Sequence, residues 1–223
     1  MTDHVAVIGG GLIGAAAAWN LARRGCAVTV VEAGIPGMAA SGRSFGWINA
    51  SFHLDEAHFR LRAEGIAAWH RLEAAVPGLA VAWPGCLIWE ESGPALETQA
   101  ADLAALGYPV ETWDRAKVRA RVPAVAAPEA ALFLPAEGAA EGGVVARQLL
   151  AASGARVLAG CAVAAIETRG GAVSGLRVPG GVLPADRVLL AAGTGAVKEH
   201  TKSGPFSLPL QVTPVRSQQA SKS

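Results

Sequence analysis

The first part of the chain alternates between apolar runs and a glycine-rich turn. An apolar run at residues 5–8 precedes four glycines within six positions, a stretch of small and apolar residues follows, and a second, mostly apolar run at residues 27–31 is followed by Glu32. Short apolar runs bounded by glycine predict strands, and the stretch between them has the length of a helix. The pattern therefore predicts a strand, a tight turn, a helix and a second, parallel strand.

Three of these glycines, Gly9, Gly11 and Gly14, have the spacing G-x-G-x-x-G. In this motif the first glycine allows the turn, the second lets the backbone approach a pyrophosphate, and the third lets the helix pack closely on the sheet. The helix N-terminus offers free N–H groups to the phosphates. Glu32 stands where a carboxylate can accept hydrogen bonds from both hydroxyls of an adenosine ribose, which disfavours NADP. Glycines used only for packing would not require that acid.

A different composition follows Glu32. Residues 33–51 are rich in Gly, Ser and Ala and have no periodicity, so we expect a loop that runs from the ribose toward the rest of the cofactor. Ser41, Arg43 and Ser44 offer donors for phosphate oxygens, and residues 46–48 are expected to pass close to a flat ring. An ordinary surface loop is the alternative interpretation.

The remaining pattern predicts mixed helices and strands. The apolar spacing of residues 55–75 predicts an amphipathic helix that Pro77-Gly78 ends, and Asp114 is expected to cap a short helix to Val122. We expect further helices at residues 95–106 and 144–152, and strands at residues 85–89, 109–113, 131–134, 156–158, 162–167, 172–178, 182–186 and 188–190, the last of them buried.

Composition favours a compact, cytoplasmic α/β protein. The chain has 223 residues, of which 52% are hydrophobic and 17% charged, and its net charge of +1 with dispersed Lys and Arg gives no sign of a nucleic-acid partner or a polybasic membrane contact. Three widely spaced cysteines without C-x-x-C spacing are expected to be reduced thiols. No apolar stretch is long enough for a transmembrane segment. His53, His58 and His70 lack the spacing of metal ligands, so we expect no metal.

Six motifs in order carry a family resemblance. They are VIGGGLIGAAAAWNLARRGCAVTVVE, ASGRSFGWIN, GCLIWE, ALFLPAEG, CAVAAIE and ADRVLLAAGTGA. With them the chain resembles the D-amino-acid oxidase, glycine oxidase and sarcosine oxidase superfamily of FAD-dependent amine oxidoreductases over nearly all of residues 4–216. The resemblance implies a Rossmann-like FAD-binding domain of the glutathione-reductase type, interrupted by a mixed-sheet substrate subdomain.

This architecture divides the chain into four segments. Residues 1–80 are expected to form the first part of the FAD-binding domain, 81–140 part of the substrate subdomain, 141–200 the second part of the FAD-binding domain, and 201–223 the start of a further substrate-domain segment.

The resemblance also implies which residues hold FAD. The glycines cradle the pyrophosphate, Glu32 holds the ribose, the backbone of Val163 bonds the adenine, and small residues after the last strand lie beside the cofactor. The full expected set is Gly9, Gly11, Leu12, Ile13, Gly14, Glu32, Ala33, Ser41, Arg43, Ser44, Gly46, Trp47, Val163, Ala192 and Gly193. No catalytic residue is assigned. Arg43 and Trp47 are candidates for the vicinity of the flavin, and Arg216 is either a carboxylate clamp or a structural residue of its turn.

The implied activity is oxidation of the C–N bond of a small-molecule amine or amino acid by hydride transfer to flavin N5. Two departures from the family pattern bear on it: residues 193–196 lack the usual tryptophan, and the chain ends at Ser223, before the part that normally holds the substrate carboxylate. We expect a truncated member or a fragment that binds FAD weakly, self-associates and catalyses poorly. A nicotinamide-dependent dehydrogenase and a non-catalytic nucleotide-binding module stay open as alternatives.

Overall fold

Four parallel strands form the sheet that the first residues predict. They are β1 (His4–Ile8), β2 (Ala27–Val31), β9 (Arg156–Leu158) and β13 (Arg187–Leu190), and their order is β13-β1-β2-β9. The structure is a computed structural model that describes residues 2–195. In β1, Val5 and Val7 pack with α1 (Leu12–Arg23) and α5 (Gly142–Ser153), whereas Ala6 packs on the opposite face. Both faces are therefore covered, as in other parallel sheets, and the predicted Rossmann-like α/β fold is confirmed.

A three-stranded antiparallel sheet covers that opposite face of the parallel sheet. It consists of β10 (Ala165–Arg169), β11 (Ala172–Val178) and β12 (Gly181–Pro184), and its Leu176 is fully buried against Ala6 and Val31. We expected the strand here to begin at residue 162. It begins later because residues 161–164 cross between two sheets: the Cys161 N–H donates to the Glu32 carbonyl, and the Ala164 N–H donates to the Arg177 carbonyl.

The expected buried strand at residues 188–190 is only partly buried. Within residues 2–195, β13 is an edge strand of the parallel sheet, and the Leu190 side chain is 49% exposed. The expectation followed from apolar composition, which does not distinguish an edge strand from a central one.

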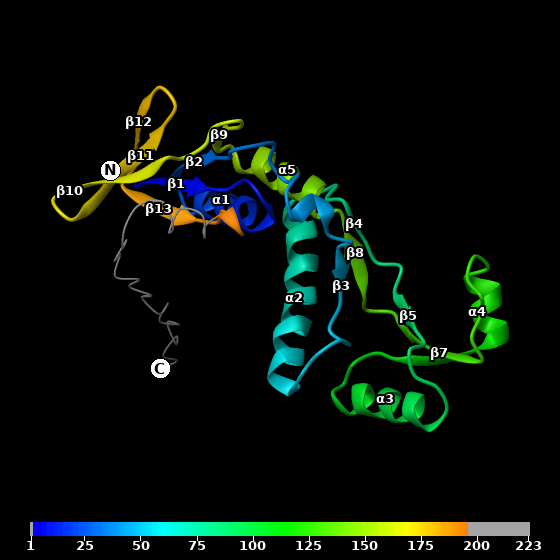
Figure 1. Cartoon of the computed structure of the whole chain (residues 1–223). Coiled ribbons are helices and arrows are strands. Elements are labelled where there is room, and N and C mark those ends of the chain that lie inside the picture. The colour runs from blue at the N-terminus through cyan, green and yellow to red at the C-terminus, as the bar shows by residue number, and fades with distance from the viewer. Residues whose placement is uncertain (1, 196–223) are drawn as a thin grey trace, which may run out of the picture.

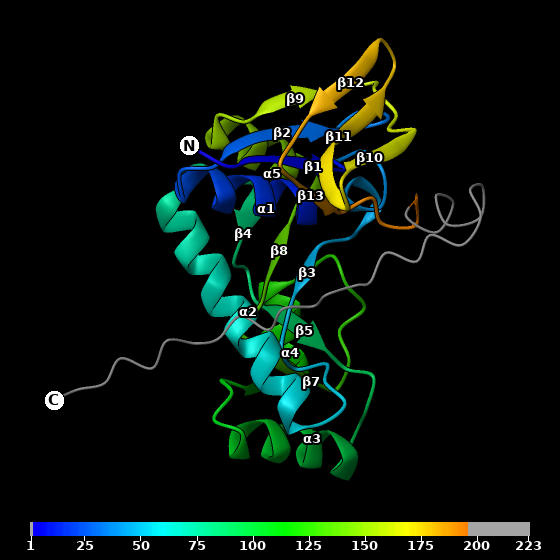
Figure 2. The same cartoon turned by 90° about the vertical axis from the view of Figure 1, so that its left-hand side faces the viewer.

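Residues 47–140 extend away from the parallel sheet (Figure 1). One three-stranded sheet here consists of β3 (Trp47–Ile48), β8 (Gly138–Ala140) and β4 (Val81–Ala82). It leads to another three-stranded sheet, of β5 (Cys86–Ile88), β7 (Ala130–Leu134) and β6 (Glu111–Asp114). Helices α3 (Pro94–Ala105) and α4 (Arg115–Arg121) lie at the far end, and the long α2 (Glu56–Ala75) runs beside β3 (Figure 2). One hydrophobic cluster spans both parts and includes Val7, Val30, Ile66, Leu134 and Leu149.

Aspartate side chains cap the N-termini of α2 and α4. The Asp55 carboxylate accepts from the His58 N–H at 2.7 Å, and the Asp114 carboxylate accepts from the Lys117 N–H at 2.7 Å, which confirms the predicted cap at Asp114. By contrast, α5 begins at Gly142 rather than at residue 144. A Cβ on Gly143 would lie 2.7 Å from the Gly37 carbonyl oxygen, so the first turn of α5 carries glycine because residues 37–42 pack directly on it.

The four-segment division of the chain stays a prediction, and its last segment lies outside the described residues. No helix within residues 2–195 combines the length and apolar composition that a membrane crossing requires. The same residues contain no group of three or more His, Cys, Asp or Glu side chains that could hold a metal ion.

Candidate functional site

The turn between β1 and α1 is built by two glycines that the fold requires. Gly9 has a φ of +107°, and a Cβ at that position would lie 2.5 Å from the Ala191 carbonyl oxygen. A Cβ on Gly14 would lie under 3.0 Å from the Gly9 carbonyl oxygen. The turn, the first helical turn and the end of β13 therefore meet by backbone contact, at the carboxyl edge of the sheet where nucleotides bind in such folds.

Glu32 ties this turn to the end of β2. One carboxylate oxygen accepts from the Gly10 N–H at 2.7 Å, and the other accepts from the Gly34 N–H at 2.8 Å. Each oxygen of a carboxylate has a second lone pair, so both remain able to accept from a ribose hydroxyl. Glu32 thus orients the turn as well as standing at the expected ribose position.

Replacing Glu32 should weaken FAD binding. We expect Glu32→Ala to lower FAD affinity by about 10- to 150-fold, which corresponds to the roughly 1.5–3 kcal/mol of hydrogen bonds to a charged group. Fluorescence quenching on FAD titration measures the change. Glu32→Gln is the matched control, because it keeps the volume and one acceptor oxygen and should give a smaller loss. Wild-type affinity in the alanine variant would contradict the ribose role.

Ser41 lies at the N-terminus of α1. Its hydroxyl oxygen accepts from the Leu12 N–H at 2.9 Å, where an anion would meet the helix dipole. Residues 33–51, predicted as a loop, contain a short 3₁₀ helix at Ser41–Arg43 and the strand β3. The pairing of β3 with β8 (Trp47 opposite Ala139) gives the segment a fixed position that its composition does not indicate.

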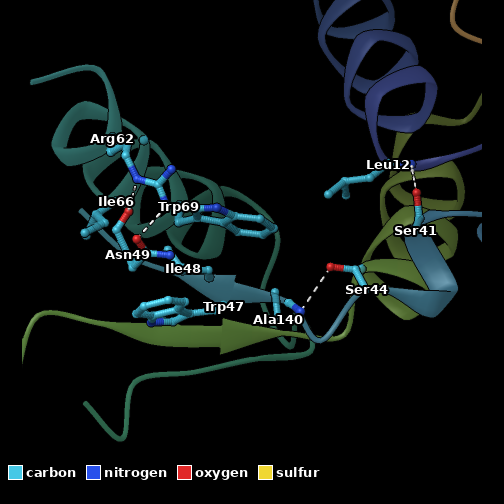
Figure 3. Close-up of a pocket in the computed structure, with 13 residues that line it drawn as sticks. Leu12, Ser41, Ser44, Trp47, Ile48, Asn49, Arg62, Ile66, Trp69 and Ala140 are labelled. Carbon is cyan, nitrogen blue, oxygen red and sulfur yellow. Dashed lines mark hydrogen bonds between the residues drawn. The ribbon is translucent and has the colours of Figure 1, made fainter. Parts of the chain in front are cut away.

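A cavity of about 320 Å³ opens beside Ser41 (Figure 3). Leu12 and Ser41 line one end, Trp47 and Ile48 of β3 line one side, and Ile66 and Trp69 of α2 line another. Ser44 and Gly46 also line it. Mostly apolar walls with a few polar groups are typical of sites for small molecules and cofactors.

The structure brings most of the predicted site residues to one region. Those at the turn and around the cavity are Gly9, Gly11, Leu12, Gly14, Glu32, Ser41, Ser44, Gly46, Trp47 and Ala192. Val163 lies in the crossing segment that begins beside Glu32. Ile13, Ala33, Arg43 and Gly193 are exposed and do not line the cavity. Arg216 lies outside the described residues. That these residues hold FAD stays a proposal.

Sequence reasoning missed the buried acid Glu137. Its side chain has no exposed surface, and its carboxylate accepts from the Trp47 indole N–H at 2.8 Å and from the Tyr108 hydroxyl at 3.1 Å. Burial and then the charge of Glu137 raise the pKa of Tyr108 well above its ordinary value. The sequence around Glu137 does not indicate that this acid is buried, because its hydrogen-bond partners lie up to 90 positions away.

The same charge acts on Cys86. Burial, and secondarily the Glu137 carboxylate, raise the pKa of the Cys86 thiol from 9.0 to about 11. Because only the thiolate is nucleophilic, we expect alkylation of Cys86 by iodoacetamide at pH 8 to be about a hundredfold slower than that of a thiol of pKa 9. Mass spectrometry of the Cys86 peptide measures the rate, which should keep rising between pH 9 and pH 11. A plateau at pH 9 would show that the thiol is not shielded.

Comparisons with known proteins agree with this geometry. The family described as FAD dependent oxidoreductase (DAO) matches residues 4–221. The chain is 34% identical, over 95% of its length, to the tRNA 5-methylaminomethyl-2-thiouridine biosynthesis bifunctional protein MnmC of Methylibium petroleiphilum, of which it covers 33%. A second MnmC, from Cupriavidus metallidurans, is 33% identical over 91% of this chain and 32% of that protein.

Solved structures show the same fold. Glycine oxidase from Geobacillus kaustophilus superposes with a TM-score of 0.75 and 25% identity over 89% of this chain and 58% of that one. L-proline dehydrogenase from P. horikoshii gives a TM-score of 0.72 and 22% identity over 91% and 57%. The chain therefore spans about a third of its MnmC relatives and somewhat more than half of these enzymes. The glycine-built turn, the acid after β2 and the match over residues 4–221 agree: the chain belongs to the family of FAD-dependent oxidoreductases.

Proposed function

We propose that this protein binds FAD across the turn after β1 and the cavity beside Ser41, and that it oxidises the C–N bond of an amine. The family match indicates FAD as the cofactor, which the resemblance of the sequence also implies. The reaction, the substrate and the residues that hold the cofactor are the proposal.

Gly11 carries the proposal. Its φ is −73° and its ψ is −178°, an extended conformation that any residue adopts. A Cβ there would approach only the Ser41 hydroxyl, at 3.2 Å, and that side chain can rotate. The fold therefore requires glycine at positions 9 and 14 but not at position 11. Close approach of a ligand to the backbone explains this glycine, which is the role of the middle glycine in a pyrophosphate-binding turn.

The charge and shape of the site suit the parts of FAD. The N–H groups at the start of α1 and the Ser41 hydroxyl suit phosphate oxygens, and the Glu32 carboxylate suits ribose hydroxyls. Trp47, Ile48, Ile66 and Trp69 give the cavity apolar walls. The chemistry that bound FAD supplies is acceptance of a hydride equivalent from the amine-bearing carbon, which leaves an imine for water to hydrolyse.

Two substrate classes follow from the relatives. The structural neighbours are named for oxidation of the amino acids glycine and proline. The MnmC relatives are named for biosynthesis of a methylaminomethyl nucleoside of tRNA, which also carries an amine. The absence of a nucleic-acid partner stays a prediction: the small net charge favours it, whereas the tRNA in the names of the MnmC relatives does not. A cytoplasmic location stays a prediction.

Anaerobic reduction of the FAD-loaded protein tests the proposal. Glycine, sarcosine, L-proline and a tRNA that carries the methylaminomethyl group are added separately, and loss of the visible flavin absorbance is followed for hours so that slow chemistry registers. We expect at least one amine to reduce the flavin. Reduction by NADH with none of the amines active would overturn amine oxidation while leaving FAD binding intact.

A further inference from the structure

Glu137 is the only charged side chain in the buried part of residues 2–195. Its Oε1 accepts from the Ala50 N–H at 3.3 Å, the Ser51 N–H at 3.1 Å and the Tyr108 hydroxyl at 3.1 Å, and its Oε2 accepts from the Trp47 indole N–H at 2.8 Å. None of the ion pairs among these residues includes Glu137. Burying a carboxylate without a cation costs free energy unless hydrogen-bond donors compensate it, so each of the four bonds contributes to the stability of this arrangement.

Three of the four donors belong to one short segment, residues 47–51. The same segment is held from its other side by Arg62 of α2, which donates through Nε to the Asn49 carbonyl at 3.2 Å and through Nη2 to Asn49 Oδ1 at 2.5 Å (Figure 3). Residues 47–51 therefore lie between a buried anion and a partly buried cation that do not pair with each other. Such bonds are short-ranged and directional, which fixes the segment in one arrangement.

Trp47 and Ile48 of this segment also form a wall of the cavity. Glu137 itself does not line the cavity, so it acts there only through the segment that it holds. We propose that Glu137 is a positioning residue that fixes Trp47 and the backbone of residues 50–51, and thereby sets the cavity wall against which the flavin binds. The inference rests on the proposed FAD site.

Replacing Glu137 by glutamine tests one of its four hydrogen bonds separately, the bond from the Trp47 indole N–H. An amide offers one acceptor oxygen and one NH₂ donor, and three donors already converge on the Oε1 side. In Glu137→Gln the oxygen is therefore expected to stay on that side, and the NH₂ then faces the Trp47 indole N–H, donor against donor. Trp47→Phe removes that indole N–H. The effect of Glu137→Gln should consequently be much smaller in the Trp47→Phe background than in the wild-type background.

The experiment compares the wild type, the two single variants and the double variant. FAD affinity and the visible circular dichroism of bound FAD, which responds to asymmetric groups around the flavin, are measured together with thermal unfolding. We expect Glu137→Gln to lower FAD affinity about tenfold, the scale of one charge-assisted hydrogen bond, and to change the flavin spectrum. Relative to Trp47→Phe, the double variant should lose less than about threefold.

Val118→Ala is the stability control, because Val118 is fully buried in a separate cluster on α4. It should lower the unfolding temperature and leave the flavin spectrum unchanged. If Glu137→Gln fails to fold, Trp47→Phe alone must change the flavin spectrum. An unchanged spectrum in all Glu137 and Trp47 variants, or additive losses in the double variant, would overturn the positioning role. A wild-type protein that binds no FAD would instead contradict the proposed function.

Discussion

Replacing Gly14 by alanine should destabilise the protein by about 3 kcal/mol or more, at the upper end of overpacking effects. The reason is backbone contact: the added Cβ would lie under 3.0 Å from the Gly9 carbonyl oxygen and 3.4 Å from the Ala191 Cβ. Neither the turn nor the end of β13 offers a flexible side chain that could move aside. Urea unfolding followed by circular dichroism measures the loss, which is a large share of the total stability of a typical domain.

Gly65 provides the matched control for this substitution. It also lies inside a helix, α2, but a Cβ added there would meet no atom within 4 Å apart from its chain neighbours and the backbone of the same helix. Gly65→Ala should therefore stabilise the protein by about 0.5–1 kcal/mol through helix propensity and reduced freedom of the unfolded chain. Opposite signs for the two variants are the expected result. Equal small effects would show that α1 does not pack on the turn as closely as described.

Replacing Gly11 by valine should remove FAD binding without unfolding the protein. The extended backbone of Gly11 accepts valine, and the only atom near the new Cβ is the Ser41 hydroxyl oxygen. We expect stability to fall by about 0.5–2 kcal/mol, because valine is a poorer N-cap than glycine. The isopropyl group would occupy the space that the pyrophosphate needs, so FAD affinity should fall by about 100-fold or more, or nearly 3 kcal/mol.

FAD titration and urea unfolding of the same preparation separate the two effects. Gly11→Ala is the graded control, since its smaller side chain should give an intermediate loss of affinity. Wild-type FAD affinity in Gly11→Val would place the cofactor elsewhere. A loss of stability as large as that expected for Gly14→Ala would instead mean that the fold itself needs this glycine.

The sequence predicts what depends on neighbouring residues. The βαβ unit, the cap at Asp114 and the strand at residues 172–178 follow from local composition and spacing, and the structure has all of them. The short strands β4 and β8 were not predicted, because two or three residues contain no measurable alternation. The burial of β13 was misjudged, because edge position is a property of the whole sheet.

The candidate site likewise contains residues that the sequence predicts and residues that it does not. The turn glycines, Glu32 and Ser41 belong to one sequence motif and the loop that follows it, so their proximity could be expected. Glu137 and Arg62 could not, because their importance comes from contacts with residues 47–51, made from distant parts of the chain. A lone acid or arginine in a sequence does not reveal that it will be buried.

Equilibrium binding of FAD in competition with NAD⁺ tests the central claim most directly. FAD is titrated into the apoprotein with and without excess NAD⁺, and flavin fluorescence quenching gives the stoichiometry and affinity. We predict one FAD per chain, an affinity that NAD⁺ does not change, and loss of binding in Gly11→Val. Binding of NAD⁺ with no saturable binding of FAD would contradict the account.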